Sequence, residues 1–404
     1  MISVEEALQR LLAPLEPVPV EQVSVADGIG RVLAEDLAAR RTQPPFAVSA
    51  MDGYAVRAED VAEVPATLKI IAEIPAGAGF GGRLGPGEAA RIFTGAPMPE
   101  GADAIVIQED TERDGDRVQV KEGAPQGRYV RREGLDFAEG EVLLKAGRRL
   151  TPRDIGLAAA MNRPWLMVHR RPVVGILSTG DEIVMPGDPI GPHQIVSSNS
   201  MSLAAFVTAT GGVPVLVGNA PDDPDALRRI ATAARGVDLF VTTGGVSVGE
   251  HDLVRDVLAE EGLEIDFWQI AMRPGKPLMV GRYRGAPMVG LPGNPVSTLV
   301  CALLFLKPAL DRLSGLPAGA TETVTARLGV ALKQNDRRQD YLRSRLVRAA
   351  DGTLEAVPFE VQDSSMMRPL AAADCLVIRA PNAPALAPGS MVPIIPFPGG
   401  AWPL

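Results

Sequence analysis

Four short segments between residues 178 and 297 combine glycines, hydroxyls and carboxylates. They are STGDE (178–182), APDD (220–223), TTGGVSVGEHD (242–252) and LPGNPVS (291–297). Glycines let backbone N–H groups approach an anion, hydroxyls add donors, and the N-terminus of a following helix adds positive potential. Carboxylates beside such a site are expected when a divalent cation links them to a phosphate. The segments therefore predict a site for a phosphorylated ligand with Mg²⁺.

The candidate ligand-binding residues in these segments carry a hydroxyl or allow a close backbone approach. They are Ser178, Thr179, Gly180, Gly244, Gly245, Ser247 and Gly249, with Pro292, Gly293, Asn294 and Pro295 in the PGNP loop. A further segment, MRPGKP, supplies positive charge through Lys276 and Arg273, as the neutralisation of a phosphate requires. Two prolines and a glycine around these bases favour a fixed loop.

Each segment also has a purely structural interpretation. Asp223 and Asn294 precede prolines at the starts of expected helices, where such side chains normally act as caps. A lone TGG is a common turn, and Arg273 and Lys276 are equally compatible with a solvated surface. The interpretation as a site depends on the four segments meeting at one edge of a sheet.

Residues 170–315 alternate between strand and helix patterns. The expected strands are RPVVGILS, VPVLVGN, VDLFVTT and LEIDFWQI, followed by a hairpin in KPLMVGRYRGAPMVGL. The expected helices are NSMSLAAFVTATGG, DDPDALRRIATAARG, EHDLVRDVLAEEG and NPVSTLVCALLFLKPALDRL. This alternation predicts a doubly wound α/β sheet with mostly parallel strands. In such a sheet, ligands bind beyond the carboxyl ends of the strands, where all four segments fall.

The regions on either side of this unit have different patterns. Residues 41–140 contain short alternating runs such as TLKIIAEI and DRVQVKEG, which indicate a small β domain. The residues from Leu316 onward have short strands with Pro and Gly turns, which indicate a β-barrel or sandwich. The amphipathic segment Val4 to Leu12 predicts a helix that packs on the α/β unit.

Composition limits the class of protein. A chain of 404 residues is expected to form about two to four domains. The net charge of −9 disfavours nucleic acid as a partner. No apolar run reaches transmembrane length, so no membrane partner is expected. Two isolated cysteines, Cys301 and Cys375, indicate a reducing, cytoplasmic compartment.

Several catalytic motifs are missing from the places where they would function. The sequence has no Walker A segment and no suitably placed GxGxxG, which excludes simple P-loop and nicotinamide enzymes. It also has no GxSxG elbow with a plausible histidine partner. Metal-assisted chemistry on a bound phosphate remains.

Six ordered motifs together resemble the molybdopterin molybdenumtransferase family, the family of MoeA and the gephyrin E domain. They are SAMDGYAV, IFTGAPMPEGADAIV, LSTGDEI, TTGGVSVGEHD, MRPGKP and GLPGNPVS, which run from about residue 44 to residue 300. The resemblance implies insertion of molybdate into adenylylated molybdopterin, with Mg²⁺-dependent hydrolysis of the adenylate and release of AMP. It also implies a homodimer in which the α/β domain of one subunit faces the β-rich second domain of the other.

The resemblance implies roles for individual residues and a division into domains. Asp52, Thr94 and Asp136 match functional positions of the second domain, and Glu182, Asp222 and Asp252 match active-site carboxylates and candidate Mg²⁺ ligands. The implied domains are a molybdopterin-binding α/β domain (1–20 and 170–315), a linking domain (21–43 and 141–169), a β-rich second domain (44–140) and a C-terminal β domain (316–404).

Three positions differ from the pattern of the family. Gln269 and Arg273 stand where relatives often have basic residues or lysine, and Ser198 stands where relatives often have aspartate. Two other functions of the same fold are a partner-clustering scaffold and adenylyl transfer to molybdopterin. The chain lacks the long linkers of the first and has both flanking β regions, which the second does not need. The adenylyltransferase of the preceding step is a candidate partner.

Overall fold

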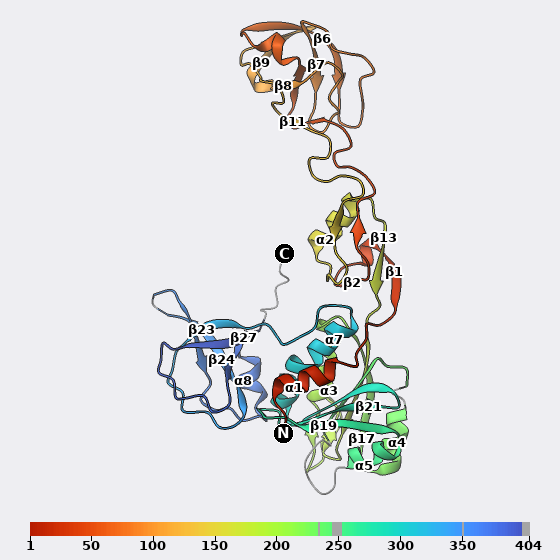
Figure 1. Cartoon of the computed structure of the whole chain (residues 1–404), viewed down its shortest axis with the longest axis vertical. Helices are drawn as coiled ribbons and strands as arrows, with labels where there is room; N and C mark the ends of the chain where they lie inside the picture. The colour runs from red at the N-terminus through yellow and green to blue at the C-terminus, as the bar shows by residue number, and fades with distance from the viewer. Residues whose placement is uncertain (233–234, 245–252, 350, 398–404) are drawn as a thin grey trace.

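The computed structural model describes the chain except for residues 233–234, 245–252, 350 and 398–404. The molecule is elongated (Figure 1). A β-rich part lies at one end, a small part containing α2 lies in the middle, and the α/β part and a barrel lie side by side at the other end. The predicted fold class is confirmed, since each of these parts has the predicted architecture.

The α/β part is built on a six-stranded sheet with the order β17-β14-β18-β22-β21-β19. The strands are β14 (Val173–Thr179), β17 (Val213–Ala220), β18 (Leu239–Thr243), β19 (Leu263–Gln269), β21 (Pro277–Tyr283) and β22 (Ala286–Leu291). β21 is the antiparallel strand, and it forms the predicted hairpin with β22. Ser178 lies opposite Thr243, and Thr243 opposite Leu291, so three parallel strands end at the same level.

Helices cover both faces of this sheet, as a doubly wound fold requires. The helices are α1 (Val4–Leu12), α3 (Asn199–Ala209), α4 (Pro224–Thr232), α5 (Leu253–Glu260), α6 (Pro295–Cys301) and α7 (Lys307–Leu313), with a π-helical segment (Ala302–Leu306) joining the last two. Leu203 of α3 and Leu310 of α7 share one core with Val241, whereas Leu227 of α4 and Leu258 of α5 share another with Phe240. Because neighbouring residues of β18 point to opposite faces, both faces are apolar.

The predicted N-terminal helix packs where the sequence indicated. Ser3 caps α1 by accepting a hydrogen bond from the backbone N–H of Glu6 at 3.0 Å. Ala7, Leu8 and Leu11 fall on one face because their spacing matches the helical period, and they join the core of the α/β part. The N-terminus therefore packs against a unit that begins more than 150 residues later in the chain.

The middle part is held by short strands and one helix. The strands are β1 (Val20–Ser24), β2 (Val32–Leu33), β3 (Leu37–Ala38), β12 (Val142–Leu144) and β13 (Trp165–His169), and the helix is α2 (Pro152–Ala160). A capping box between Thr151 and Asp154 starts α2. Leu33, Phe137 and Leu166 belong to one core, so two distant stretches of chain fold together here.

The β-rich part is a six-stranded sheet with the order β8-β5-β7-β6-β10-β9. Its strands are β5 (Gly53–Val56), β6 (Ala66–Ile74), β7 (Glu88–Ile92), β8 (Ala104–Ile107), β9 (Thr111–Asp114) and β10 (Arg117–Val120). A two-stranded pair, β4 (Val48–Ser49) and β11 (Val130–Arg131), lies next to it. Two cores, one around Tyr54 and one around Ile92, fill the part.

The C-terminal part is a closed barrel. Its strands are β23 (Val324–Leu328), β24 (Gln339–Arg348), β25 (Leu354–Pro358), β26 (Cys375–Arg379) and β27 (Met391–Pro396), and α8 (Met367–Ala371) is its helix. Pairing of β24 with β26 closes the ring. A short strand, β20 (Met272–Arg273), leaves the α/β part and pairs with β24 in parallel. The barrel is thus joined to the loop that carries Arg273.

Candidate active site at the carboxyl edge of the α/β sheet

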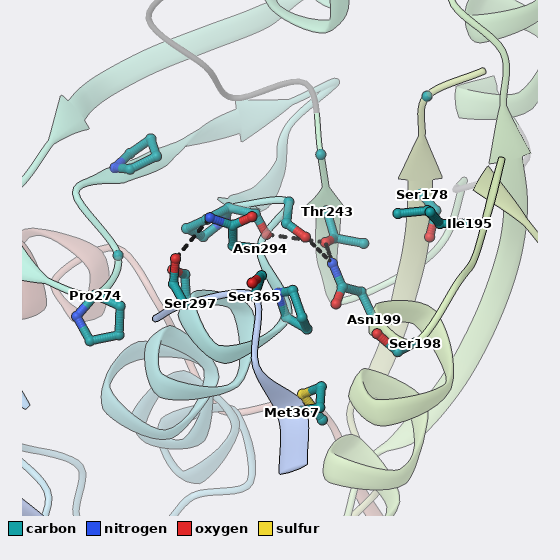
Figure 2. A pocket seen from close by; sticks show the side chains of 18 of the residues that line it. Ser178, Ile195, Ser198, Asn199, Thr243, Pro274, Asn294, Ser297, Ser365 and Met367 are labelled. Atoms are coloured by element: carbon teal, nitrogen blue, oxygen red, sulfur yellow. Dashed lines mark hydrogen bonds between the residues drawn. The ribbon is translucent and has the colours of Figure 1, made fainter. Parts of the chain in front are cut away.

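A pocket of about 1290 Å³ opens at the carboxyl ends of β14, β18 and β22. Figure 2 shows that its walls come from several loops. The candidate residues that line it are Ser178, Thr179, Gly180, Glu182, Asp222, Gly244, Arg273, Lys276, Pro292, Gly293, Asn294 and Pro295. The four predicted segments therefore meet at one edge. Gly245, Ser247, Gly249 and Asp252 lie outside the described residues.

One wall of the pocket holds buried hydroxyls without a partner. Ser178 is 4% exposed and Thr179 is 6% exposed. Among the described residues, neither the Ser178 Oγ nor the Thr179 Oγ1 has a hydrogen-bond partner. A buried hydroxyl without a partner costs free energy. Because both residues line the pocket, a ligand with oxygen acceptors is the natural partner of these donors.

The segment after β18 approaches the segment after β14 closely. Gly244 has a φ of +88°, and a Cβ at this position would lie 2.7 Å from the carbonyl oxygen of Thr179. Any larger residue would push the two loops apart. Gly244 is therefore needed to form the pocket wall, whatever its contact with a ligand.

Asn199 cross-links the loops and was not identified from the sequence. Its side-chain amide donates to Thr243 Oγ1 at 2.9 Å and to the carbonyl oxygen of Gly293 at 2.7 Å. Asn199 is the first residue of α3, so one side chain ties the start of a helix to the ends of two strands (Figure 2).

Carboxylates gather on the side of the pocket between β14 and β17. The backbone N–H of Asp222 donates to Asp181 Oδ1 at 2.9 Å, and Glu182 lines the pocket nearby. Desolvation raises the pKa of the Asp222 carboxyl, and the negative charges of Asp181 and Glu182 raise the pKa further. The described residues contain no complete three-ligand metal group. Glu182 and Asp222 thus form an acidic wall of the pocket, in which the negative charges of the carboxylates repel one another.

Asp223 and Asn294 each precede a helix that begins with proline, and the structure gives them different roles. Asp223 caps α4, because its Oδ1 accepts the backbone N–H of Ala226 at 2.7 Å. Asn294 occupies the N-cap position of α6, but its side chain makes no bond to the helix. Its amide donates instead to Ser364 Oγ at 2.8 Å.

The two basic residues of the MRPGKP segment differ in how their charges are used. Arg273 forms ion pairs with Asp336 at 3.2 Å and with the buried Asp340. Its charge is therefore already balanced by carboxylates of the C-terminal part. Lys276 lines the pocket and has no ion pair among the residues that the structure describes. Lys276 is consequently the base available to a bound anion.

The C-terminal part supplies a wall of the pocket that the sequence did not indicate. Its lining residues are Arg338, Gln362, Asp363, Ser364, Ser365 and Met367. The carbonyl oxygen of Ser364 accepts the backbone N–H of Val296 at 3.0 Å, in the first turn of α6. The loop is therefore docked on the same helix terminus that the PGNP loop precedes.

Asp52, Thr94 and Asp136 do not reach this pocket within the chain. Asp52 Oδ1 accepts the backbone N–H of Thr94 at 2.7 Å and its hydroxyl at 2.8 Å. These two bonds lower the pKa of the Asp52 carboxyl. Asp52 precedes β5, Thr94 follows β7, and the β-rich part lies at the far end of the molecule (Figure 1). Asp136 is exposed near Gln43, whose carbonyl oxygen its N–H contacts at 3.0 Å.

Three family models match the chain in order. They are the MoeA N-terminal region, domains I and II (residues 2–162), a probable molybdopterin binding domain (175–312) and the MoeA C-terminal region, domain IV (325–397). A molybdopterin molybdenumtransferase from Haemophilus influenzae is 32% identical over 98% of this chain and 99% of its own length. One from Bacillus subtilis is 35% identical over 93% and 90%. The chain belongs to the molybdopterin molybdenumtransferase family.

A further relative and a solved structure agree with this family assignment. A molybdopterin molybdenumtransferase from Nostoc sp. is 42% identical over 78% of this chain and 74% of its own length. The crystal structure of a molybdopterin biosynthesis MoeA protein from Pyrococcus horikoshii OT3 superposes with a TM-score of 0.84 at 28% identity, over 98% of this chain and 100% of the other. The family is one of transferases in molybdenum cofactor biosynthesis. In the described residues, no helix is long and apolar enough to span a membrane.

Proposed function

We propose that this protein inserts molybdate into adenylylated molybdopterin, with hydrolysis of the adenylate and release of AMP. Hydrolysis adds one water molecule across the phosphoanhydride between the pterin phosphate and AMP. The pocket itself carries the proposal: one wall has donors without a partner among the described residues, and another has crowded carboxylates. A ligand with an anionic phosphate and a metal-binding group matches both walls.

The donor wall is suited to the oxygens of the phosphate and of molybdate. The hydroxyls of Ser178 and Thr179 supply neutral donors, and the ammonium group of Lys276 supplies charge. The Ser178 and Thr179 hydroxyls are held in place by β14, so they need little rearrangement when charge develops on the ligand. Ser364 and Ser365 face the same pocket from the C-terminal part.

The acidic wall fits a bound Mg²⁺. Asp181 and Glu182 raise the pKa of Asp222 through their charges, and a divalent cation would relieve that repulsion. Glu182 and Asp222 are the proposed ligands, together with Asp252, which lies outside the described residues. When bound, Mg²⁺ would neutralise negative charge on the pyrophosphate.

A homodimer would bring the remaining candidate residues to the pocket. Asp52, Thr94 and Asp136 are at least partly exposed and belong to the end of the chain that lies away from the α/β part. A second copy placed head to tail would present this end to the pocket. The proposed cleft is then shared, with Asp52 and its partner Thr94 from one subunit and Glu182 and Asp222 from the other.

We also propose four domains and a cytoplasmic location. The four proposed domains follow the separate cores around Val241, Phe137, Tyr54 and Val377. Cys301 and Cys375 are free and buried, which is compatible with the cytoplasm. The adenylyltransferase of the preceding step remains the candidate transient partner, because its product is the proposed substrate.

Substrate requirement tests the proposal against adenylyl transfer. The purified protein is incubated with molybdopterin adenylate and molybdate, or with molybdopterin and ATP, and the nucleotide products are separated. AMP release from the adenylate is expected, whereas pyrophosphate release from ATP would support the earlier step. Glu182→Gln should abolish AMP release. Asp188→Asn, an exposed acid of the same loop outside the pocket lining, is the matched control.

A further inference from the structure

Arg91 is the centre of an interaction cluster next to Asp52. It lies in β7, directly opposite Tyr54 of β5. Its guanidinium carbon is 5.2 Å from the ring centroid of Tyr54 and 4.8 Å from that of Phe93. Two aromatic faces therefore restrict the orientation of the guanidinium group.

The hydrogen bonds of Arg91 go to the turn that carries Asp52. Arg91 Nη1 donates to the carbonyl oxygen of Gly53 at 3.1 Å, and Nη2 donates to Gln108 Oε1 at 2.7 Å. The backbone N–H of Gln108 in turn donates to the carbonyl oxygen of Asp52 at 3.1 Å. The carbonyl groups of Asp52 and Gly53 are both held by this network.

Gly53 lies against β8 with no room for a side chain. A Cβ at this position would lie 2.0 Å from the carbonyl oxygen of Val106, so a side chain here is excluded by β8. The backbone of Asp52–Gly53 therefore packs directly on the next strand, and Arg91 closes the opposite side.

We infer that Arg91 is a positioning residue, which fixes the Asp52 carboxylate for the reaction in the shared cleft. This inference rests on the proposed function of Asp52. Arg91 acts through the backbone of the turn, while Thr94 holds the carboxylate itself. Both Thr94 bonds go to Oδ1, and within the described part of the chain Oδ2 remains for a ligand.

The charge of Arg91 also acts on Asp52. Both hydrogen bonds of the guanidinium go to neutral oxygens, so its positive charge is not cancelled by them. The bonds from Thr94 lower the pKa of Asp52 most, and the charge of Arg91 lowers that pKa further. Asp52 thus stays ionised at its place in the turn.

A simpler role for Arg91 is to brace the sheet. It connects β7 to the start of β5 and to the residue after β8, and loss of such a brace would lower stability alone. The two roles differ in the chemistry of Asp52. A brace changes the melting temperature, whereas a positioning residue also changes the pKa of Asp52 and the value of kcat.

Two variants of the full-length protein separate these roles. Arg91→Gln removes the charge, and Arg91→Lys keeps the charge but loses the forked geometry. The pKa of Asp52 is measured by ¹³C NMR of labelled aspartate carboxyls, assigned by comparison with Asp52→Asn. Molybdate-dependent AMP release gives kcat and KM. Arg113→Gln, in β9 of the same sheet, is the matched control.

Arg91→Gln should raise the pKa of Asp52 and lower kcat by about tenfold or more, with little change in KM, because misplacement of a reacting group is costly. Arg91→Lys should lower kcat less than Arg91→Gln does, and the pKa of Asp52 should stay near its value in the unaltered protein. Arg113→Gln should behave as the unaltered protein.

Three results would overturn or redirect the inference. An unchanged pKa and kcat in Arg91→Gln, with a lower melting temperature only, would reduce Arg91 to a brace. If Arg91→Gln does not fold, an Arg91→Lys protein with full kcat would overturn the inference as well. Full activity in Asp52→Asn would instead contradict the proposed role of Asp52. The failure of the inference is therefore distinguishable from the failure of the proposed function.

Discussion

The side-chain amide of Asn199 donates a hydrogen bond of 2.9 Å to the hydroxyl of Thr243. Asn199 begins α3 and Thr243 ends β18, and the same amide reaches the carbonyl oxygen of Gly293 beyond β22. One side chain thereby fixes the separation of two loops that line the pocket. The shape of the pocket depends on this link as much as on the sheet.

Asn199→Ala should enlarge the pocket and weaken substrate binding. The change removes two hydrogen bonds and should cost about 1–3 kcal/mol of stability. We expect KM for the pterin adenylate to rise by about tenfold, with a smaller change in kcat, because the loops remain present but less constrained. Steady-state AMP release measures both constants. Thr208→Ala, on the same helix away from the pocket, is the control, and an unchanged KM in Asn199→Ala would contradict the link.

Asp222→Asn should trade activity for stability. The pKa of Asp222 is raised in the folded protein, so the carboxyl binds its proton more tightly there than in the unfolded chain. The contribution of Asp222 to the free energy of unfolding therefore falls as pH rises through the unfolded and folded pKa values. At neutral pH we expect Asp222→Asn to melt at a higher temperature and to lose AMP release.

Melting curves at several pH values, with and without Mg²⁺, check this expectation. The stabilisation of Asp222→Asn should shrink at acidic pH, where Asp222 is protonated, and Mg²⁺ should stabilise the variant less than the unaltered protein. Equal Mg²⁺ stabilisation of both proteins would argue against Asp222 as a ligand.

The ion pairs of Arg273 should contribute unequally to stability. The side chain of Asp340 is 5% exposed, whereas that of Asp336 is 42% exposed. Arg273→Ala leaves the buried Asp340 without this partner, which should cost about 1–3 kcal/mol, because the Arg273 side chain is itself 47% exposed. Asp336→Asn should cost less than about 1 kcal/mol. Urea unfolding compares the two variants, and similar losses would contradict this difference.

The sequence was sufficient to predict the edge of the sheet where the pocket lies. Alternating strand and helix patterns placed STGDE and LPGNPVS after strands, and parallel strands end at one edge. The helix Val4–Leu12 was predictable because its apolar residues follow the helical period. The cap function of Asp223 was predictable from the proline that follows it.

Contacts between distant parts of the chain could not be predicted in this way. Ser364 lies 70 residues after Asn294, and no periodicity links the two positions. The pairing of Arg273 with Asp340 depends on β20 joining a barrel strand, which has no local signal in the sequence. For the same reason, no local pattern indicated that Arg273, which lines the pocket, also pairs with Asp336 and Asp340 of the C-terminal part.

Subunit mixing tests the shared cleft. Asp52→Asn should fold normally, because the amide oxygen of Asn can still accept both bonds from Thr94. Both Asp52→Asn and Glu182→Gln should be inactive alone. In a mixed dimer, one of the two clefts would keep both carboxylates, so some AMP release should return. Subunits that exchange, as shown by mass spectrometry, without any return of activity would contradict a shared cleft.

The ratio of AMP released to molybdenum incorporated tests the proposed reaction most directly. Purified protein is loaded with molybdopterin adenylate, a limiting amount of molybdate is added, and both products are quantified in the same samples. If hydrolysis and insertion are coupled, about one AMP should appear for each molybdenum bound to the pterin, and neither product should form without Mg²⁺. AMP released at the same rate without molybdate, or molybdenum bound without AMP release, would contradict the proposed function.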